Sequence, residues 1–486
     1  MNRGFNNDKY LQMQSEKIRE RINSFGDKLY LEFGGKLFDD YHASRVLPGF
    51  EPDSKMQMLL TLKDQAEVVV VVSAKDIESS KIRADLGITY DEDVLRLVDA
   101  FRDKGLLVEN VVITHYQNQK SVSRLARRLA RKGVRVSHHY TIEGYPTDTQ
   151  KILSEQGFGK NDYVVTSRPL VVVTAPGPGS GKMATCLSQL YHEHKKGVKA
   201  GYAKFETFPI WNIPLSHPVN LAYEAATADL NDKNMIDPYH LEAYGKVTVN
   251  YNRDIEIFPV LKNIFEAIYG TSPYKSPTDM GVNMAGFCIE DDAACQEASK
   301  QEILRRYFST RNRYYQEKCG VDELQRQEML LSSCGLTPED RPCVAAARKR
   351  SKQRGVYCGA IEMADGRLVT SSTTDFMGPC AGLVINAIKA LAGIDDNVLL
   401  MGEEAFTPIQ TLKTQYLGSQ NPRLHTDEAL IALALSAKQS PDAARALEQL
   451  KNLRGLQAHI TSDISDIDLH IYNSLGISLT WEPDKH

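Results

Sequence analysis

Residues 171–197 carry the pattern with the clearest chemistry. The stretch reads VVVTAPGPGSGKMATCLSQLYHEHKKG: an apolar run, a glycine-rich turn that ends in Lys182, and then a helical pattern. A phosphate loop needs these three parts, because the strand holds the loop, the glycines let backbone N–H groups curl around phosphate oxygens, and the helix start points at the anion. The residues predicted to bind phosphate are Gly177, Gly179, Ser180, Gly181, Lys182 and Met183.

Two residues depart from the standard motif G-x-x-x-x-G-K-[ST]. Pro176 occupies the first glycine position, and Met183 replaces the hydroxyl residue that would ligate magnesium. Thr185 does not take over that role, because it lies about 200° around the helix from position 183. Two interpretations stay open: a modified anion site built from the backbone of residues 177–183 and Lys182, or a plain glycine-rich turn. We predict the modified site.

The residues downstream of this loop resemble a known enzyme domain. KAGYAKFETFPIWN and AATADLND match, in order and spacing, the synthetase domain of CTP synthetase and its relative dethiobiotin synthetase, a resemblance that spans residues 170–232. It implies that Lys204 on the next strand acts with Lys182 in catalysis. It also implies that Asp229 binds a metal, and that ATP and magnesium are the cofactors. The sequence shows no glutamine amidotransferase part, which argues against CTP synthesis itself.

A second group of polar residues follows these strands. The segment KNMIDPYHLEAYGK places Asp237, His240 and Glu242 close together. They form either the second half of an active site, which binds a metal or an acceptor substrate, or a loop that enters a helix. In the second case Asp237 accepts hydrogen bonds from the first N–H groups of that helix.

Two further groups of residues each have two possible roles, in a ligand site or in the ordinary structure of the fold. Lys81 and Arg83 follow a buried strand, so they either bind an anion at the carboxyl end of a sheet or lie in a solvated loop. Asp375 precedes a helix; it either caps that helix or belongs to a ligand site with Thr373 and Thr374.

The C-terminal region resembles the deaminase-like fold. Two strand patterns flank the turn Asp365-Gly366, and the helical pattern GPCAGLVINAIKALAG follows them. Zinc deaminases need H-x-E or C-x-E together with P-C-x-x-C. Here Gly382 stands where the glutamate belongs, and no C-x-x-C follows Cys380. We therefore expect the topology without the zinc chemistry.

The rest of the chain must position these residues, and its patterns alternate between strand and helix. EVVVVVS (67–73) reads as a strand buried on both faces, and helices are predicted at 9–25 and 91–104. This alternation predicts an α/β fold with a doubly wound, mostly parallel sheet and a P-loop-like strand-turn-helix. KLYLEF-GG-KLFDD predicts a hairpin that turns at Gly34 and Gly35.

The sequence pattern changes twice along the chain, which suggests three domains. We predict an α/β P-loop-like domain at 1–234, a mainly helical domain at 235–350, and a C-terminal α/β domain at 351–486. The helical part is expected to supply contacts for a homo-oligomer.

Composition excludes several classes of protein. The chain has 486 residues with 58 basic and 62 acidic side chains, a net charge of −4, which does not favour nucleic-acid or membrane-surface partners. The eight cysteines are scattered without a C-x-x-C pair, as expected in a reducing cytoplasm. The sequence has no apolar stretch near the roughly 20 residues that cross a bilayer. We expect a cytoplasmic protein.

Several long segments resemble one bacterial family over almost the whole chain. KIRADLGITYDEDVLRLVDAFR, NLAYEAATADLNDKNMIDPYHLEAYGK and VNYNRDIEIFPVL are similar to the uncharacterised protein family 0371, also grouped as domain of unknown function 1846. The resemblance implies a fold but no activity. The glycine-rich loop, together with what the resemblance to the synthetase domain implies, predicts an enzyme that uses ATP and magnesium, of the synthetase, ligase or kinase kind. The alternative is an assembly or regulatory protein that binds a nucleotide or phosphorylated metabolite without turnover.

Overall fold

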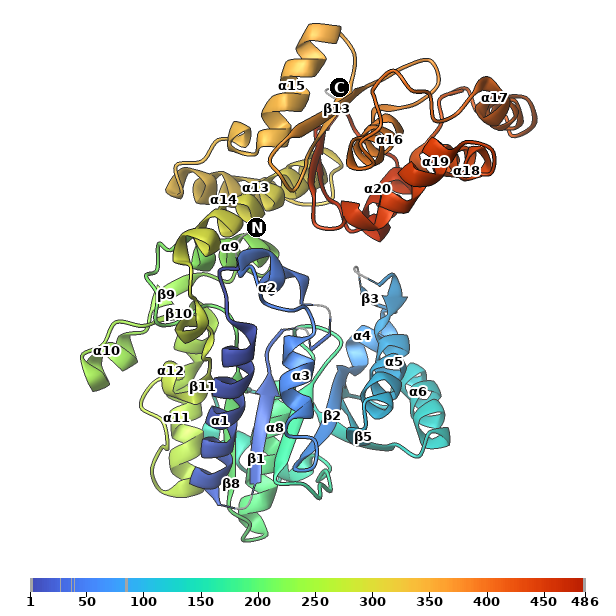
Figure 1. Ribbon diagram of the computed structural model, residues 1–486. Helices are drawn as coiled ribbons and strands as arrows, with labels where there is room; N and C mark the ends of the chain where they lie inside the picture. Colours follow the sequence, from blue (N-terminus) through green and yellow to red (C-terminus); the bar gives the residue numbers. More distant parts are fainter. Residues whose placement is uncertain (1–2, 27, 36, 39, 84–85, 484–486) are drawn as a thin grey trace. The chain divides into compact units, whose positions relative to one another are not determined.

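The computed structural model describes residues 3–26, 28–35, 37–38, 40–83 and 86–483 (Figure 1). By compactness the chain splits into two units, the first ending at Ser299 and the second beginning at Lys300. The predicted boundaries after residues 234 and 350 stay predictions. Within the described residues, no helix is long and apolar enough to span a membrane.

A parallel sheet forms the centre of the first unit. Its described strands number seven, in the order β11-β8-β1-β7-β2-β5-β6, and every neighbouring pair is parallel. All eight residues of β2 are buried, as expected when helices cover both faces of a parallel sheet. This confirms the predicted α/β class and the parallel sheet. The strands are β1 (Lys28–Phe33), β2 (Ala66–Ser73), β5 (Leu107–Tyr116), β6 (Arg135–Tyr140), β7 (Leu170–Thr174), β8 (Ala200–Phe205) and β11 (Gly281–Val282).

Helices cover the sheet. One apolar cluster joins side chains of the strands, such as Val171 and Val173, to Leu187 and Leu190 of α8 and to Phe258 of α11. The helices α1, α3 and α5 belong to the opposite side (Figure 1). The helices of this unit are α1 (Asn7–Phe25), α2 (Tyr41–Val46), α3 (Ser54–Leu60), α4 (Ala74–Glu78), α5 (Tyr90–Asp103), α6 (Lys120–Arg131), α7 (Thr149–Ile152), α8 (Lys182–Lys195), α9 (Pro218–Ala226), α10 (Pro238–Tyr244), α11 (Asn252–Tyr269) and α12 (Pro277–Met280).

The ends of α1 show how local sequence sets an element. The Asn6 side chain accepts a hydrogen bond from the Lys9 backbone N–H at 3.0 Å, which caps the first turn. The helix ends at Gly26, whose φ of 92° suits a residue without a Cβ.

Short strand pairs complete the unit: β3 (Ile82–Arg83) with β4 (Ile88–Thr89), and β9 (Asn234–Ile236) with β10 (Val249–Tyr251).

The predicted hairpin at 28–40 is wrong. β1 pairs in parallel with β7 and β8, and the described residues between Gly34 and Asp40 form no strand. The Gly34 N–H donates to the Phe205 carbonyl oxygen at 3.0 Å, and a Cβ on Gly34 would lie 2.8 Å from that oxygen. Gly34 is therefore a point of close approach between two parallel strands, and not a hairpin turn.

The second unit has a smaller sheet of mixed direction. Its order is β13-β12-β14-β15; β12 (Cys358–Glu362) is antiparallel to β13 (Leu368–Ser372) and to β14 (Gln457–Ile460), while β14 is parallel to β15 (Ser478–Trp481). The β12–β13 hairpin turns at Asp365-Gly366 as predicted. The likeness to a deaminase-like topology stays a prediction. The helices are α13 (Asp292–Tyr315, which starts in the first unit), α14 (Val321–Ser333), α15 (Pro342–Arg354), α16 (Pro379–Leu391), α17 (Glu403–Thr411), α18 (Thr426–Ser436), α19 (Pro441–Leu447) and α20 (Asp466–Leu475).

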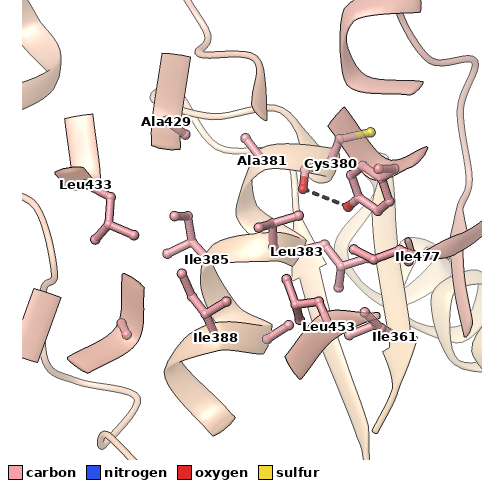
Figure 2. Close-up of a cluster of buried hydrophobic side chains, with 14 of the residues drawn as sticks. Ile361, Cys380, Ala381, Leu383, Ile385, Ile388, Ala429, Leu433, Leu453 and Ile477 are labelled. Carbon is pink, nitrogen blue, oxygen red and sulfur yellow. Dashed lines mark hydrogen bonds between the residues drawn. The ribbon is translucent and has the colours of Figure 1, made fainter. Parts of the chain in front are cut away.

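The core of the second unit surrounds α16. Leu383, Ile385 and Ile388 of this helix pack with Leu433 and Leu453 from later segments (Figure 2). The fully buried Tyr472 donates a hydrogen bond from its hydroxyl to the Cys380 carbonyl oxygen at 2.9 Å, so the only polar atom of its side chain is satisfied inside the core. Cys380 is itself buried in this cluster, which gives it a packing role.

Candidate functional site

The glycine-rich loop lies where the order of the parallel strands reverses. The chain reaches β7 from β6 at one edge of the sheet, inserts β7 between β1 and β2, and then continues to β8 on the far side of β1. In open α/β sheets, ligands bind at the carboxyl ends of the strands at such a switch point. The loop of residues 175–181 occupies this position and leads directly into α8.

Close packing holds the loop in one shape. Gly179 and Gly181 have φ of 74° and 90°, in the region that favours glycine. The Ser180 hydroxyl donates to the Gly177 carbonyl oxygen at 2.8 Å, and the Thr114 hydroxyl at the end of β5 donates to the Ser180 carbonyl oxygen at 2.7 Å. A Cβ on Gly177 would lie 2.2 Å from the Tyr90 hydroxyl oxygen. The loop is thus fixed by its neighbours and by its own side chain.

The backbone N–H groups of the loop are left without acceptors. Within the described part of the chain, the N–H groups from Gly177 to Ala184 donate to no carbonyl and no side chain; Pro178 has none. The first N–H with a partner is that of Thr185, which donates to the Gly181 carbonyl oxygen at 3.0 Å. A plain turn would use these groups on its own carbonyls, whereas here they stay available to an anion.

Lys182 is partly buried and unpaired. Its ammonium group has no hydrogen bond or ion pair with any of the described residues. Burial lowers the pKa of Lys182, and although Glu32 opposes this shift, the positive charges of Lys204 and Arg253 add to it. A lysine in this setting gains a partner if a phosphate enters the loop.

Lys204, by contrast, is buried in an ion-pair cluster. Its ammonium group bonds to the Asp254 carboxylate at the start of α11, lies 3.1 Å from a carboxylate oxygen of Glu206, and sits 4.3 Å from the centre of the Tyr251 ring. Burial disfavours the charge of Lys204, but Asp254 and Glu206 outweigh it and raise its pKa. Burial raises the pKa of Glu206 to about 8. The Lys204 charge opposes this rise, and the Asp254 charge adds to it.

The strand register explains how these charges meet. Glu32 of β1 lies opposite Lys204 of β8 on one side and opposite Val173 of β7 on the other. Glu32 is buried and accepts a hydrogen bond from the Tyr202 hydroxyl at 2.6 Å. The end of β7, where the loop begins, therefore lies beside this charged cluster.

Asp229 lies on the connection between α9 and β9. It lies exposed on a short 3₁₀ turn at Ala228–Leu230 and, among the described residues, pairs with neither lysine. Its neighbour Asp232 is buried and contacts Arg253, with 2.6 Å between Nε and Oδ1. The structure thus brings Lys182 and Lys204 into one charged region, while the metal-binding role of Asp229 stays a prediction.

Sequence reasoning missed the carboxylates of this region: Glu32, Glu206 and Asp254. Each comes from a different part of the chain, so no local motif joins them. Two signals were present in the sequence. Glu32 interrupts an otherwise apolar strand, and Glu206 follows Lys204 by two residues, where alternation along an extended segment places both on one side.

The other candidate groups have structural partners. Asp237 caps α10, accepting hydrogen bonds from the N–H groups of Tyr239 and His240 at 3.0 Å each, as one of the two interpretations predicted. Lys81 lies 3.3 Å from Asp76.

Two more of these groups can be placed. Arg83 pairs with Asp93 at 2.8 Å. Asp375 is exposed and is not the cap of α16, whose N-cap is Gly378, so that interpretation was wrong. Across the described residues, no three His, Cys, Asp or Glu side chains gather in a way that could hold a metal ion.

Comparison with known proteins gives two family models that cover nearly the whole chain. The N-terminal domain of unknown function DUF1846 matches residues 3–335, and its C-terminal counterpart matches residues 339–486. A UPF0371 protein of Corynebacterium diphtheriae is 57% identical over 99% of this chain and 97% of its own length. UPF0371 proteins of Corynebacterium urealyticum and Streptococcus thermophilus are 56% and 55% identical over the same shares.

The packing of Gly177 generates a first prediction. Gly177→Ala should lower the free energy of unfolding by about 1–3 kcal/mol, because the new methyl group collides with the Tyr90 hydroxyl. Adding Tyr90→Phe should restore part of this loss. The matched control is Gly179→Ala, which has open space around it but a φ of 74°, so its loss comes from backbone strain and Tyr90→Phe should not repair it. Equal rescue of both variants in urea unfolding would contradict the packing described.

The Lys204 cluster generates a second prediction. Lys204→Met should cost about 3–5 kcal/mol of unfolding free energy, because it leaves Asp254 and Glu206 buried without their cation. The double variant Lys204→Met/Glu206→Gln should recover part of that cost. Lys262→Met on the exposed side of α11 serves as the control and should change little. A loss below about 1 kcal/mol for Lys204→Met, measured by urea unfolding, would show that the cluster is not a paired unit.

Proposed function

We propose that this chain, which belongs to the DUF1846 family of UPF0371 proteins, binds the phosphate groups of a nucleotide, ATP in the first instance, with residues 177–183. The observation that carries the proposal is the unpaired state of this loop. Its N–H groups and the ammonium group of Lys182 are all donors, and none of them has an acceptor among the described residues. Phosphate oxygens are the acceptors that such a set of donors recognises.

The energetics of Lys182 support the same proposal. An unpaired, partly buried ammonium group costs stability, and its lowered pKa reflects that cost. A bound phosphate would supply the missing negative charge and offset the cost. Residues that lower the stability of the free protein in this way are often kept for function.

The environment of the loop suits a nucleotide-dependent enzyme of the synthetase, ligase or kinase kind. Lys182 would hold the phosphates, and the Lys204 cluster lies beside it. Burial raises the pKa of Glu206, which is the direction that brings a carboxyl group closer to the proton exchange a general acid or base performs. Buried groups with shifted pKa values gather at active sites more often than elsewhere.

Magnesium would have to be held differently from the standard motif. Met183 provides no oxygen, and its side chain packs against the apolar cluster under α8. When bound with ATP, the ion supplies charge neutralisation at the phosphates. Of this chain's residues, Asp229 is the one proposed to ligate it, together with water, because an exposed carboxylate is a hard oxygen ligand.

A second function is favoured by Met183, which stands where the standard motif has a hydroxyl ligand for magnesium. This residue suits a protein that binds a nucleotide or a phosphorylated metabolite without turnover, as part of assembly or regulation. The donors of the loop would then bind the same phosphate groups, and the Lys204 cluster would be structural. The two functions differ in their need for magnesium.

Lys182→Ala tests the proposal. For the wild type, ATP at a hundredfold excess over Kd should add about 2.7 kcal/mol of stability, measured as a shift of Tm. Lys182→Ala should lose most of this shift while its own Tm without ATP equals or exceeds that of the wild type, because an unpaired cation has been removed. Lys262→Ala, which removes an exposed lysine of the same unit, should respond to ATP like the wild type.

A full ATP response in Lys182→Ala would remove the loop from the nucleotide site. The same titration with and without magnesium separates the two functions. Binding that strengthens with magnesium supports the enzyme, whereas binding that is indifferent to magnesium supports the non-catalytic alternative.

A further inference from the structure

One pocket lies wholly within the C-terminal unit. Its volume is about 760 Å³. It opens at one end of the smaller sheet, where β13, β14 and β15 finish and β12 begins. The residues that line it are Arg348, Ser351, Lys352, Gly355, Val356, Tyr357, Thr373, Arg423, Thr461 and Glu482.

Positive charge dominates the lining. Three of these side chains are cationic, Arg348, Lys352 and Arg423, and one is anionic, Glu482. Helix α15 forms part of the wall and carries no acidic residue between Pro342 and Arg354, while five of its side chains are Lys or Arg. The pocket therefore has a net charge of +2 from its lining residues and a basic surround.

The single carboxylate is already neutralised. Glu482 contacts the Arg348 guanidinium, with 2.5 Å between its carboxylate and Nε. Burial raises the pKa of Glu482, but His459 and Arg348 outweigh it and bring the pKa to about 2, so the carboxylate stays ionised and paired. Arg348 also pairs with Glu339. Arg348 is thus satisfied by protein groups.

Lys352 and Arg423 retain donors that none of the described residues uses. Lys352 is exposed and, within the described residues, has no hydrogen bond and no ion pair. Arg423 donates from Nε to the Thr374 carbonyl oxygen at 2.8 Å, which orients the guanidinium and leaves its two terminal nitrogens available. A guanidinium oriented in this way binds phosphate or carboxylate through two parallel hydrogen bonds.

An apolar wall stands beside these cations. Tyr357 is 52% exposed and Val356 is 40% exposed, although both are apolar or aromatic. An exposed ring at the rim of a basic pocket suits a ligand with a flat organic part next to its charged group. The volume suits one small molecule and is too small for a macromolecule. The chain's net charge of −4 also argues against a nucleic-acid surface.

We propose that this pocket binds a small organic phosphate, with the phosphate group held by Arg423 and Lys352 and a ring of the ligand resting on Tyr357. All residues that line this pocket belong to the C-terminal unit, so the proposal does not rest on the glycine-rich loop. Of the residues first considered for a ligand site near Asp375, Thr373 lines the pocket.

The test uses the full chain carrying Lys182→Ala, which weakens phosphate binding at the glycine-rich loop. AMP and inorganic phosphate are titrated by calorimetry. AMP should still bind, and Lys352→Ala/Arg423→Ala should weaken it at least tenfold. The matched control Lys438→Ala/Lys451→Ala removes two lysines of the same unit that lie outside the pocket and should bind AMP unchanged. Tyr357→Ala should weaken AMP while leaving inorganic phosphate unaffected.

The proposal is overturned if neither AMP nor inorganic phosphate binds the Lys182→Ala chain at millimolar concentration. It is also overturned if the pocket variant binds AMP as tightly as its control. Lys352→Glu alone provides a second variant, because this exposed side chain has no structural partner to lose among the described residues. It should weaken AMP binding while leaving Tm unchanged. If Lys182→Ala loses ATP binding while the pocket residues are unchanged, that result bears on the glycine-rich loop and not on this pocket.

Discussion

The parallel pairing of β1 with β7 and β8 is the constraint on which the candidate site depends. It sets Glu32 beside Lys204 and beside the last residues of β7, so the carboxyl ends of three strands meet at one edge. The residues at the end of each strand therefore determine which groups meet at this edge. β7 carries the glycine-rich loop, β8 carries Lys204 followed by Glu206, and β1 carries Glu32.

Two lysines at this edge have opposite roles because their partners differ. Lys204 is buried with Asp254 and Glu206, so its charge is satisfied inside the protein and its removal would leave two carboxylates unpaired. Lys182 is unpaired at the start of α8, next to N–H groups that also have no acceptor in the described residues. The first lysine stabilises the folded chain, and the second is available to a ligand.

The sequence predicted the parts of this structure whose signals are local. The apolar run of β2, the β12–β13 hairpin and the glycine-rich loop between β7 and α8 are each encoded within a few neighbouring residues. The hairpin at Gly34 and Gly35 was wrong, because a glycine also serves where two backbones approach closely, and the local pattern does not distinguish the two cases. Glu32, Glu206 and Asp254 were missed because only the sheet register and the start of α11 bring them together.

The most direct test of the central claim is to observe the loop amides when the nucleotide binds. A chain labelled with ¹⁵N-glycine gives separate amide signals for Gly177, Gly179 and Gly181, and also for Gly245 and Gly270, which end helices elsewhere in the same unit. With saturating ATP, the signals of the three loop glycines should shift while those of Gly245 and Gly270 stay in place. Unchanged signals for Gly179 and Gly181 at saturation would show that the loop does not bind phosphate.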